Sequence, residues 1–138
     1  IGHLGNNIKT AEVVVYSSAI DHRNPEIIEA NASEIPLYSR AEFLSILMKD
    51  KRSITISGTH GKTTTTSIIG QLLQDDAIDP TVVSGGIMNI NNSNLIFGNG
   101  DWMVVEADES DGSFLILPSE ISIITNIDND HLDYYKSM

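Results

Sequence analysis

The stretch "SITISGTHGKTTTTS" at residues 53–67 places a β-branched apolar run directly before two glycines, a lysine and four threonines. The run predicts a strand over 53–57, and the residues from 62 to 74 predict a helix. A helix that begins at a glycine turn presents unpaired backbone N–H groups and the positive end of its dipole to phosphate oxygens. The order of strand, glycine turn and helix therefore predicts a phosphate-binding turn.

The turn has the residue types that phosphate binding needs, at a shortened spacing. Gly58 and Gly61 let the backbone approach a ligand, Lys62 adds a positive charge for the β and γ phosphates, and Thr63 offers a hydroxyl to Mg²⁺. The usual G-x-x-x-x-G-K-[ST] pattern needs a glycine where this chain has Ile56, so the turn is G-x-x-G-K-T. The alternative interpretation is an ordinary helix start.

Composition limits the classes of partner. The 138 residues carry 8 Lys+Arg against 19 Asp+Glu, a net charge of -11, and no cysteine. Nucleic acids and anionic membranes are poor partners for such a chain, because they bind to basic faces. The absence of cysteine excludes disulfides and thiolate sites. Because the sequence starts without methionine and stops without a closing element, we expect it to be part of a longer protein.

Short apolar runs alternate with helical patterns along the chain, which predicts an α/β fold with parallel-sheet units and covering helices. The charge-rich link at residues 49–52 separates two such series, so we expect domains of 1–49 and 50–138. The expected strands are 11–17, 35–39, 53–57, 81–86, 94–98, 102–110 and 121–130, and the expected helices are 24–32, 39–50 and 62–74. We expect an N-cap at Asn24, a capping box of Ser39 and Glu42, and an apolar stripe of Phe43, Leu44, Leu47 and Met48.

Acidic residues follow two of the expected strands. Glu106, Asp108, Glu109 and Asp111 end the run at 102–110, and Asp128, Asp130 and His131 end the run at 121–130. Ligands bind outside the carboxyl ends of parallel strands, where the phosphate turn also lies. Carboxylates gathered there favour a shared Mg²⁺, which takes oxygen ligands. The alternatives are a solvated acidic loop and a surface histidine.

Three segments together resemble the Mur ligase family: "GTHGKTTTTS" (58–67), "EADESDGSF" (106–114) and "TNIDNDHLDYY" (125–135). The resemblance covers essentially the whole chain and includes the shortened phosphate turn. It implies the end of a Rossmann-like UDP-binding domain, followed by the first half of a P-loop ATPase domain. The rest of the ATPase domain and the C-terminal domain of that family would lie outside these 138 residues.

The resemblance implies an ATP-dependent carboxylate–amine ligase with ATP and Mg²⁺ as cofactors. Lys62 would hold the γ-phosphate, Thr63 and Glu106 would bind one Mg²⁺, and His131 would help to hold a second; Lys62, Glu106 and His131 would be the catalytic residues. The substrate carboxylate would attack the γ-phosphate, and an amine would open the acyl phosphate. The residues implied at the ATP phosphates are Gly58, Thr59, His60, Gly61, Lys62, Thr63 and Thr64.

The resemblance is greatest to the members that join L-alanine to UDP-N-acetylmuramate in the bacterial cytoplasm. It implies that His3 and Ser17 lie near the uridine diphosphate and that Gly85, Gly86 and Ser110 line the muramyl side, although turn geometry also explains the two glycines. One alternative is the family member that attaches a whole tripeptide to the same UDP sugar. Another is a non-catalytic nucleotide-binding module. We expect the 138 residues alone to have no ligase activity.

Overall fold

The computed structural model of the chain describes residues 2–88, 92–108 and 112–128. Backbone contacts divide the chain into two compact units, Ile1–Leu44 and Ser45–Met138. The division falls within helix α2 (Arg40–Met48). The predicted domain boundary at 49/50 remains a prediction, and each unit is described by itself.

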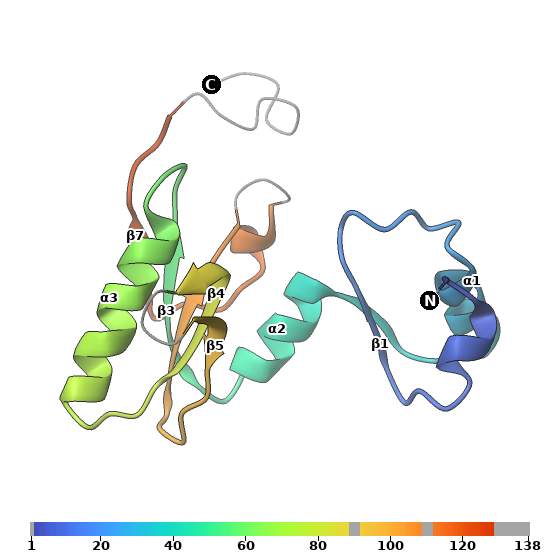
Figure 1. The fold of residues 1–138 in the computed structure, drawn as a ribbon, viewed down its shortest axis with the longest axis horizontal. Coiled ribbons are helices and arrows are strands. Elements are labelled where there is room, and N and C mark those ends of the chain that lie inside the picture. Colours follow the sequence, from blue (N-terminus) through green and yellow to red (C-terminus); the bar gives the residue numbers. More distant parts are fainter. Residues whose placement is uncertain (1, 89–91, 109–111, 129–138) are drawn as a thin grey trace. The chain divides into compact units, whose positions relative to one another are not determined.

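The first unit is built on a strand–helix–strand motif (Figure 1). Strands β1 (Val14–Tyr16) and β2 (Leu37–Ser39) pair in parallel, and helix α1 (Pro25–Ala32) connects them. The predicted N-cap is confirmed, since Asn24 Oδ1 accepts a hydrogen bond from the Glu26 N–H at 2.9 Å. A short 3-10 helix, η1 (Gly5–Ile8), packs on α1.

Helix α2 begins at the predicted capping box. The Glu42 N–H donates to Ser39 Oγ at 3.3 Å, and the Ser39 N–H donates to Glu42 Oε2 at 2.7 Å. Hydrogen bonds from the backbone and then the side chain of Ser39 lower the pKa of the Glu42 carboxyl, because they stabilise its charged form. The predicted apolar stripe is wrong at one position: Met48 is buried but Leu47 is 56% exposed. One turn of apolar side chains does not reveal which side of a short helix faces a core.

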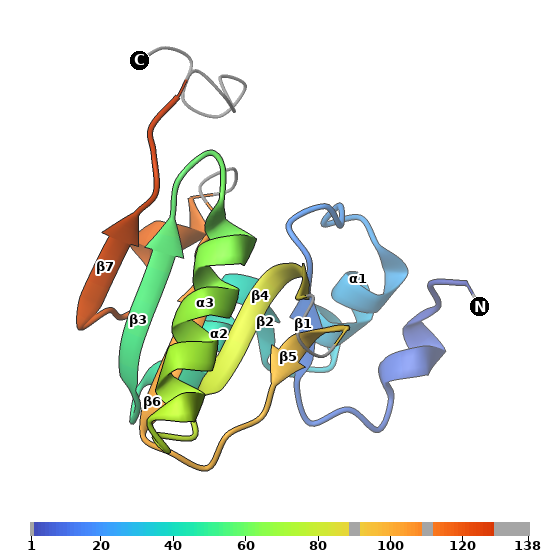
Figure 2. The ribbon, with the colours of Figure 1, turned by 60° about the vertical axis from the view of Figure 1, so that its left-hand side comes forward.

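The second unit holds a five-stranded sheet in the order β5-β4-β6-β3-β7 (Figure 2). The pairs β4–β6, β6–β3 and β3–β7 are parallel, which confirms the predicted α/β class. The pair β4–β5 is antiparallel, so the expectation of an all-parallel sheet is wrong at that edge. The elements are β3 (Arg52–Ser57), α3 (Lys62–Asp75), β4 (Thr81–Met88), β5 (Ser93–Ile96), β6 (Trp102–Glu106), the 3-10 helix η2 (Ser113–Leu115) and β7 (Ile121–Ile124).

The core of this unit lies where α3 packs against β3, β4 and β6. The buried apolar cluster joins Ile54 and Ile56 of β3 to Val82 and Met88 of β4 and Val104 of β6. Consecutive residues of the central strands are buried, as expected for strands covered on both faces. The edge strand β7 departs from that expectation, because three of its four residues are exposed.

Candidate active site

The phosphate turn predicted from the sequence lies between the end of β3 at Ser57 and the start of α3 at Lys62. Gly58 has a φ of 124° and Gly61 a φ of 82°. Residues that carry a side chain rarely adopt such positive φ values. Gly61 is the N-cap of α3. The two glycines therefore give the chain the reversal that aims the first amides of α3 at the end of the sheet.

Gly58 is also fixed by close contact with the segment that follows β7. A Cβ at Gly58 would lie 2.3 Å from Thr125 Oγ1 and 2.7 Å from the Asn126 carbonyl oxygen. Because β3 and β7 are parallel neighbours, their carboxyl ends meet at the same edge of the sheet. No side chain fits at position 58 without moving the turn or this segment.

Thr125 and Asn126 hold the backbone of the turn. The Asn126 amide accepts from the His60 N–H at 3.0 Å and donates to the His60 carbonyl at 2.8 Å, and Thr125 Oγ1 donates to the same carbonyl at 2.7 Å. The Asp128 N–H donates to Thr59 Oγ1 at 3.2 Å. The peptide groups around His60 are thus used to fix the turn, whereas the first amides of α3 have no helical acceptor and suit an anion.

Lys62 folds back over this turn. Its Nζ donates to the Gly58 carbonyl at 2.6 Å and lies 3.5 Å from the Thr59 carbonyl oxygen. The ammonium group is therefore held above the turn, beside the N-terminus of α3. An anion at this place would meet the charge of Lys62 and the helix dipole together.

Thr63 and Glu106, which the family resemblance implies as ligands of one Mg²⁺, are brought together from α3 and β6. Thr63 Oγ1 donates to Glu106 Oε2 at 3.0 Å and lies 3.3 Å from Oε1. Strands β6 and β3 are parallel neighbours, so the end of β6 lies beside the turn that follows β3. The contact joins the phosphate turn to the acidic strand end.

The residues present at this contact fit a magnesium ion. Both side chains offer oxygen atoms as ligands, and the 3.0 Å between Thr63 Oγ1 and Glu106 Oε2 matches the spacing of about 3.0 Å between adjacent ligands in an octahedron with Mg–O distances near 2.1 Å. Among the described residues no group of three His, Cys, Asp or Glu could hold a metal. Water and phosphate oxygens would complete the coordination, as is usual for Mg²⁺ at phosphate sites.

Gly85 and Gly86, predicted on the substrate side, lie against the same two residues. The Gly85 N–H donates to Glu106 Oε2 at 3.0 Å. A Cβ at Gly85 would lie 3.3 Å from Glu106 Oε1, and a Cβ at Gly86 would lie 3.3 Å from Thr63 Oγ1. The end of β4 thus approaches this contact too closely for larger side chains to fit without adjustment.

His3 and Ser17 belong to the first unit and do not share a hydrogen-bond partner there. His3 Nδ1 donates to Glu26 Oε2 at 3.0 Å, and Asn7 Nδ2 donates to Glu26 Oε1 at 2.6 Å. These bonds lower the pKa of the Glu26 carboxyl, the one from His3 having the larger effect. Ser17 Oγ accepts from the Ala19 N–H at 3.3 Å in the turn after β1.

Two further acidic candidates, Asp108 and Asp128, lie within the described residues. Asp108 follows β6, and its carbonyl oxygen accepts from the Phe114 N–H at 3.2 Å. Asp128 follows β7 and is exposed. The other predicted residues lie outside the described residues, and they are Glu109, Ser110, Asp111, Asp130 and His131.

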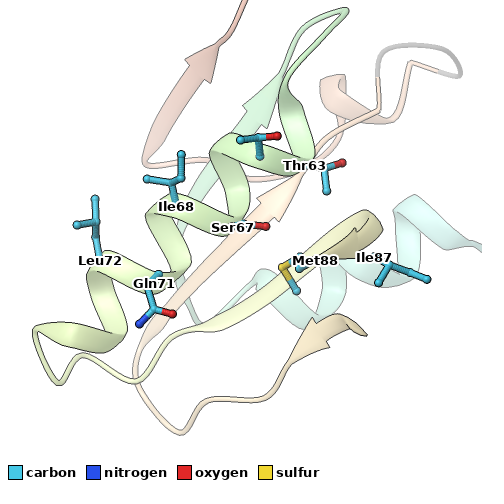
Figure 3. Close-up of a pocket in the computed structure, with 8 residues that line it drawn as sticks. Thr63, Ser67, Ile68, Gln71, Leu72, Ile87 and Met88 are labelled. Atoms are coloured by element: carbon cyan, nitrogen blue, oxygen red, sulfur yellow. The ribbon is translucent and has the colours of Figure 1, made fainter. Parts of the chain in front are cut away.

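A groove of about 340 Å³ runs from Thr63 along α3 and β4 (Figure 3). Its lining is largely apolar beyond the Thr63 end, and includes Ile68, Leu72, Ile87 and Met88. A triphosphate needs charge and backbone donors, which this lining does not supply. The head of α3 therefore suits a phosphate better than the groove does, and the groove begins beside it at Thr63.

Sequence reasoning missed two side chains that shape the site. Ser84 donates to Glu106 Oε2 at 2.7 Å, and Asn126 pairs with His60 as described above. A signal existed for Ser84, because a hydroxyl in a buried run directly before Gly85 is a polar group that needs a partner. Asn126 lies in the same segment as the acids and histidine that follow the last expected strand, and its position directly after a strand is the available signal.

The arrangement is that of an α/β protein whose mostly parallel sheet carries an anion-binding turn beside a hydroxyl–carboxylate pair. The family model of the Mur ligase middle domain matches residues 56–138, and that of the Mur ligase family catalytic domain matches residues 1–52. The chain belongs to the Mur ligase family. The resemblance proposed from the three segments is thereby confirmed.

Known relatives match nearly the whole chain. A UDP-N-acetylmuramate–L-alanine ligase of Azorhizobium caulinodans is 56% identical over 137 residues, which are 99% of this chain and 29% of the relative. The crystal structure of a UDP-N-acetylmuramate-alanine ligase from Thermotoga maritima has a TM-score of 0.88 at 33% identity, and the match covers 100% of this chain and 33% of that one. The chain thus spans about a third or less of the length of these relatives.

A more distant structure shares the fold. The UDP-N-acetylmuramate:L-alanyl-gamma-D-glutamyl-meso-diaminopimelate ligase of Neisseria meningitides has a TM-score of 0.81 at 20% identity, with 96% of this chain and 47% of that chain covered. At that identity the likeness concerns the fold alone. In the described part of the chain, no helix has the length and apolar character required to cross a bilayer.

Proposed function

We propose that the chain is part of an ATP-dependent ligase that joins L-alanine to the carboxylate of UDP-N-acetylmuramate, in bacterial peptidoglycan precursor synthesis. The observation that carries the chemistry is the 3.0 Å contact of Thr63 with Glu106 at the head of α3. The observation that favours this substrate pair is the 56% identity to a relative with that name over 99% of the chain. The proposed location is the cytoplasm, where ATP and the UDP sugar are available.

The proposed roles follow from the charges at the head of α3. The first amides of α3 and the Nζ of Lys62 bind the β and γ phosphates of ATP, and this binding orients the γ-phosphate. Thr63 and Glu106 hold Mg²⁺, which supplies charge neutralisation between two anionic reactants. Gly58 and Gly61 keep the turn open to the phosphates.

The reaction then takes two steps. An oxygen of the substrate carboxylate attacks the γ-phosphorus of ATP and the bond from that phosphorus to the β–γ bridging oxygen breaks, so that an acyl phosphate forms and ADP leaves. The amine of L-alanine attacks the acyl carbon, phosphate leaves, and the amine loses a proton. Lys62 lowers the repulsion between the carboxylate and the triphosphate in the first step. We propose that His131 helps to hold a second Mg²⁺, as the family resemblance implies.

The test is phosphate release from ATP by the full-length protein, with UDP-N-acetylmuramate present and either L-alanine, the tripeptide or no amine added. Release that depends on L-alanine is the expected result. Release that needs the tripeptide would instead favour the tripeptide-attaching branch of the family. Lys62→Ala should abolish release, since the variant lacks the positive charge at the turn.

The alternative of a non-catalytic nucleotide-binding module predicts no substrate-dependent release at all. His131→Ala separates the two alternatives further. A ligase should lose turnover by at least about tenfold while it retains ATP binding, because the proposed role of His131 concerns a second metal. A binding module has no turnover to lose.

A further inference from the structure

Ser84, on β4, makes the shortest hydrogen bond that Glu106 accepts among the described contacts. Ser84 Oγ donates to Glu106 Oε2 at 2.7 Å, and the side chain is almost fully buried, at 5% exposure. The Gly86 N–H donates to Ser84 Oγ at 3.3 Å, so the hydroxyl oxygen already has a donor and its single proton is directed to the carboxylate. Such a hydrogen bond to a charged acceptor is stronger than one between neutral groups.

Three donors from two elements converge on one oxygen of Glu106. They are the hydroxyls of Thr63 and Ser84 and the N–H of Gly85, at 3.0, 2.7 and 3.0 Å from Oε2. Two of them come from β4, which lies beside β6 in the sheet. The carboxylate is therefore held from the side of β4 in one orientation, with Oε1 also within 3.3 Å of Thr63 Oγ1.

Without the hydrogen bond from Ser84, the Glu106 side chain would be less ordered before a ligand binds. A glutamate side chain has three rotatable bonds, and fixing them costs conformational entropy. Water cannot easily take the place of the hydroxyl, because position 84 is buried. A ligand that needs Glu106 in this orientation would have to supply that ordering from its own binding energy.

We propose that Ser84 is a positioning residue that orients the Glu106 carboxylate toward Mg²⁺, together with the backbone amide of Gly85. The inference rests on the proposed function, since it takes Thr63 and Glu106 as the metal ligands. Changes to groups that orient metal ligands typically weaken metal binding by about 10- to 100-fold. Ser84→Ala should therefore reduce metal affinity by at least about tenfold.

The experiment measures binding of Mn²⁺, used in place of Mg²⁺, to the full-length protein with a non-hydrolysable ATP analogue, by the paramagnetic resonance signal of free Mn²⁺. Ser84→Ala is compared with Ser53→Ala. Ser53 is 3% exposed and its Oγ donates to the Pro118 carbonyl at 2.8 Å, so the matched control removes an equally buried hydroxyl at the far end of the sheet. Thermal unfolding of both variants shows whether they lose stability to the same extent.

The expected result is a weaker Mn²⁺ affinity in Ser84→Ala alone. In turnover assays, Ser84→Ala should need at least about tenfold more Mg²⁺ and should approach the wild-type kcat when Mg²⁺ is saturating. Ser84→Cys keeps the size of the side chain with a weaker donor, and an intermediate loss is expected. This variant also provides the test if Ser84→Ala does not fold.

Two results have separate meanings. If the wild-type protein binds the nucleotide analogue without any dependence on Mn²⁺, the proposed metal site fails. If the wild-type protein binds Mn²⁺ and both Ser84 variants bind it as tightly, the metal site stands and the role of Ser84 is overturned. A fall in kcat at saturating Mg²⁺ with unchanged Mn²⁺ affinity would also overturn it.

Discussion

Asn126 pairs with the peptide backbone of His60 through both polar atoms of its side-chain amide, accepting at 3.0 Å and donating at 2.8 Å. The pairing fixes the two peptide groups that flank His60 in the turn, from the segment that follows β7. Main-chain amides rather than side chains make up most of an anion site of this kind. The shape of the turn, and with it phosphate affinity, should therefore depend on Asn126.

Asn126→Ala should weaken binding of an ATP analogue to the full-length protein by about tenfold, because loss of two hydrogen bonds costs roughly 1 to 3 kcal/mol. Asn126→Asp should weaken it more, since a carboxylate oxygen would then face the His60 carbonyl. Titration calorimetry measures both. The control is Asn94→Asp, which adds the same charge at an exposed position of β5. Wild-type affinity in Asn126→Ala would contradict the prediction.

Gly70 is needed where α3 touches β4. A Cβ at Gly70 would lie 2.8 Å from Val82 Cγ2, and Val82 is fully buried. Gly70→Ala should lower stability by up to about 2 kcal/mol, because overpacking costs about 1 to 3 kcal/mol and the gain in helix propensity offsets about 1 kcal/mol of that cost. The measurement is the thermal midpoint of the full-length protein.

A double-mutant cycle that combines Gly70→Ala with Val82→Ala isolates the contact between these two positions. Removal of the valine methyls makes room for the new Cβ, so the double variant should lose less stability than the two single variants lose together. Additive losses would mean that the helix shifts as a whole and that the close approach of Gly70 is not the cause.

Thr66 carries a buried hydroxyl in α3. Its Oγ1 has no partner within the part of the chain that the structure describes, and the residue is fully buried in α3. Thr66→Val keeps the shape and removes the unpaired polar group, so stability should rise by about 1 kcal/mol. Thermal melting compares it with Thr65→Val at a half-buried position of the same helix. A loss of stability specific to Thr66→Val would show that the hydroxyl has a partner.

Arg52 joins β3 to Glu120, just before β7. Its guanidinium pairs with the Glu120 carboxylate, with Nε donating at 2.9 Å, and its Cζ lies 4.1 Å from the centre of the Trp102 ring. The hydrogen bonds from Arg52 lower the pKa of the Glu120 carboxyl. A lowered pKa in the folded state means that the ionised carboxylate adds stability at neutral pH and that this is lost as pH falls through the folded pKa.

Glu120→Gln imitates the protonated acid. Wild type should therefore be slightly more stable than Glu120→Gln at pH 7, and the difference in thermal midpoint should close as the pH falls below the usual range of a glutamate. The pair is exposed, so added salt should also reduce the difference. A difference that persists in acid would show that packing on Trp102, and not charge, is responsible. Glu12→Gln, at another exposed glutamate, controls for net charge.

Much of this arrangement was predictable because local chemistry decides it. The strand, glycine turn and helix at 53–74 follow from β-branched residues, two glycines and the start of a helical pattern. That the acids after β6 lie at the same edge as the turn follows from a general rule, since parallel strands bring their carboxyl ends to one edge, while the family resemblance supplied the choice of Glu106. Neither inference needed the strand order.

The missed features depend on that order. Ser84 reaches Glu106 only because β4 lies next to β6, and no residue of either strand states which neighbour it will have. The antiparallel direction of β5 did have a signal in the short gap between the expected strands 81–86 and 94–98, because a parallel pair needs a crossover of about a dozen residues or more. The exposure of Leu47 could not be predicted, because an apolar stripe on a nine-residue helix shows which side is apolar but not which other residues cover that side.

The position of β3 between β6 and β7 has a consequence for how the protein is made. Both neighbours are synthesised well after β3, since Ile54 pairs with Val104 on one edge and with Ile121 on the other. Pairings between such distant residues form slowly, because a long loop must close before they are gained. During synthesis on the ribosome, the residues of the glycine turn are therefore present before the strands and segments that fix the turn have been made. Until residues 121–124 emerge, β3 keeps one open edge, which is when a nascent sheet is most prone to pair with the wrong strand.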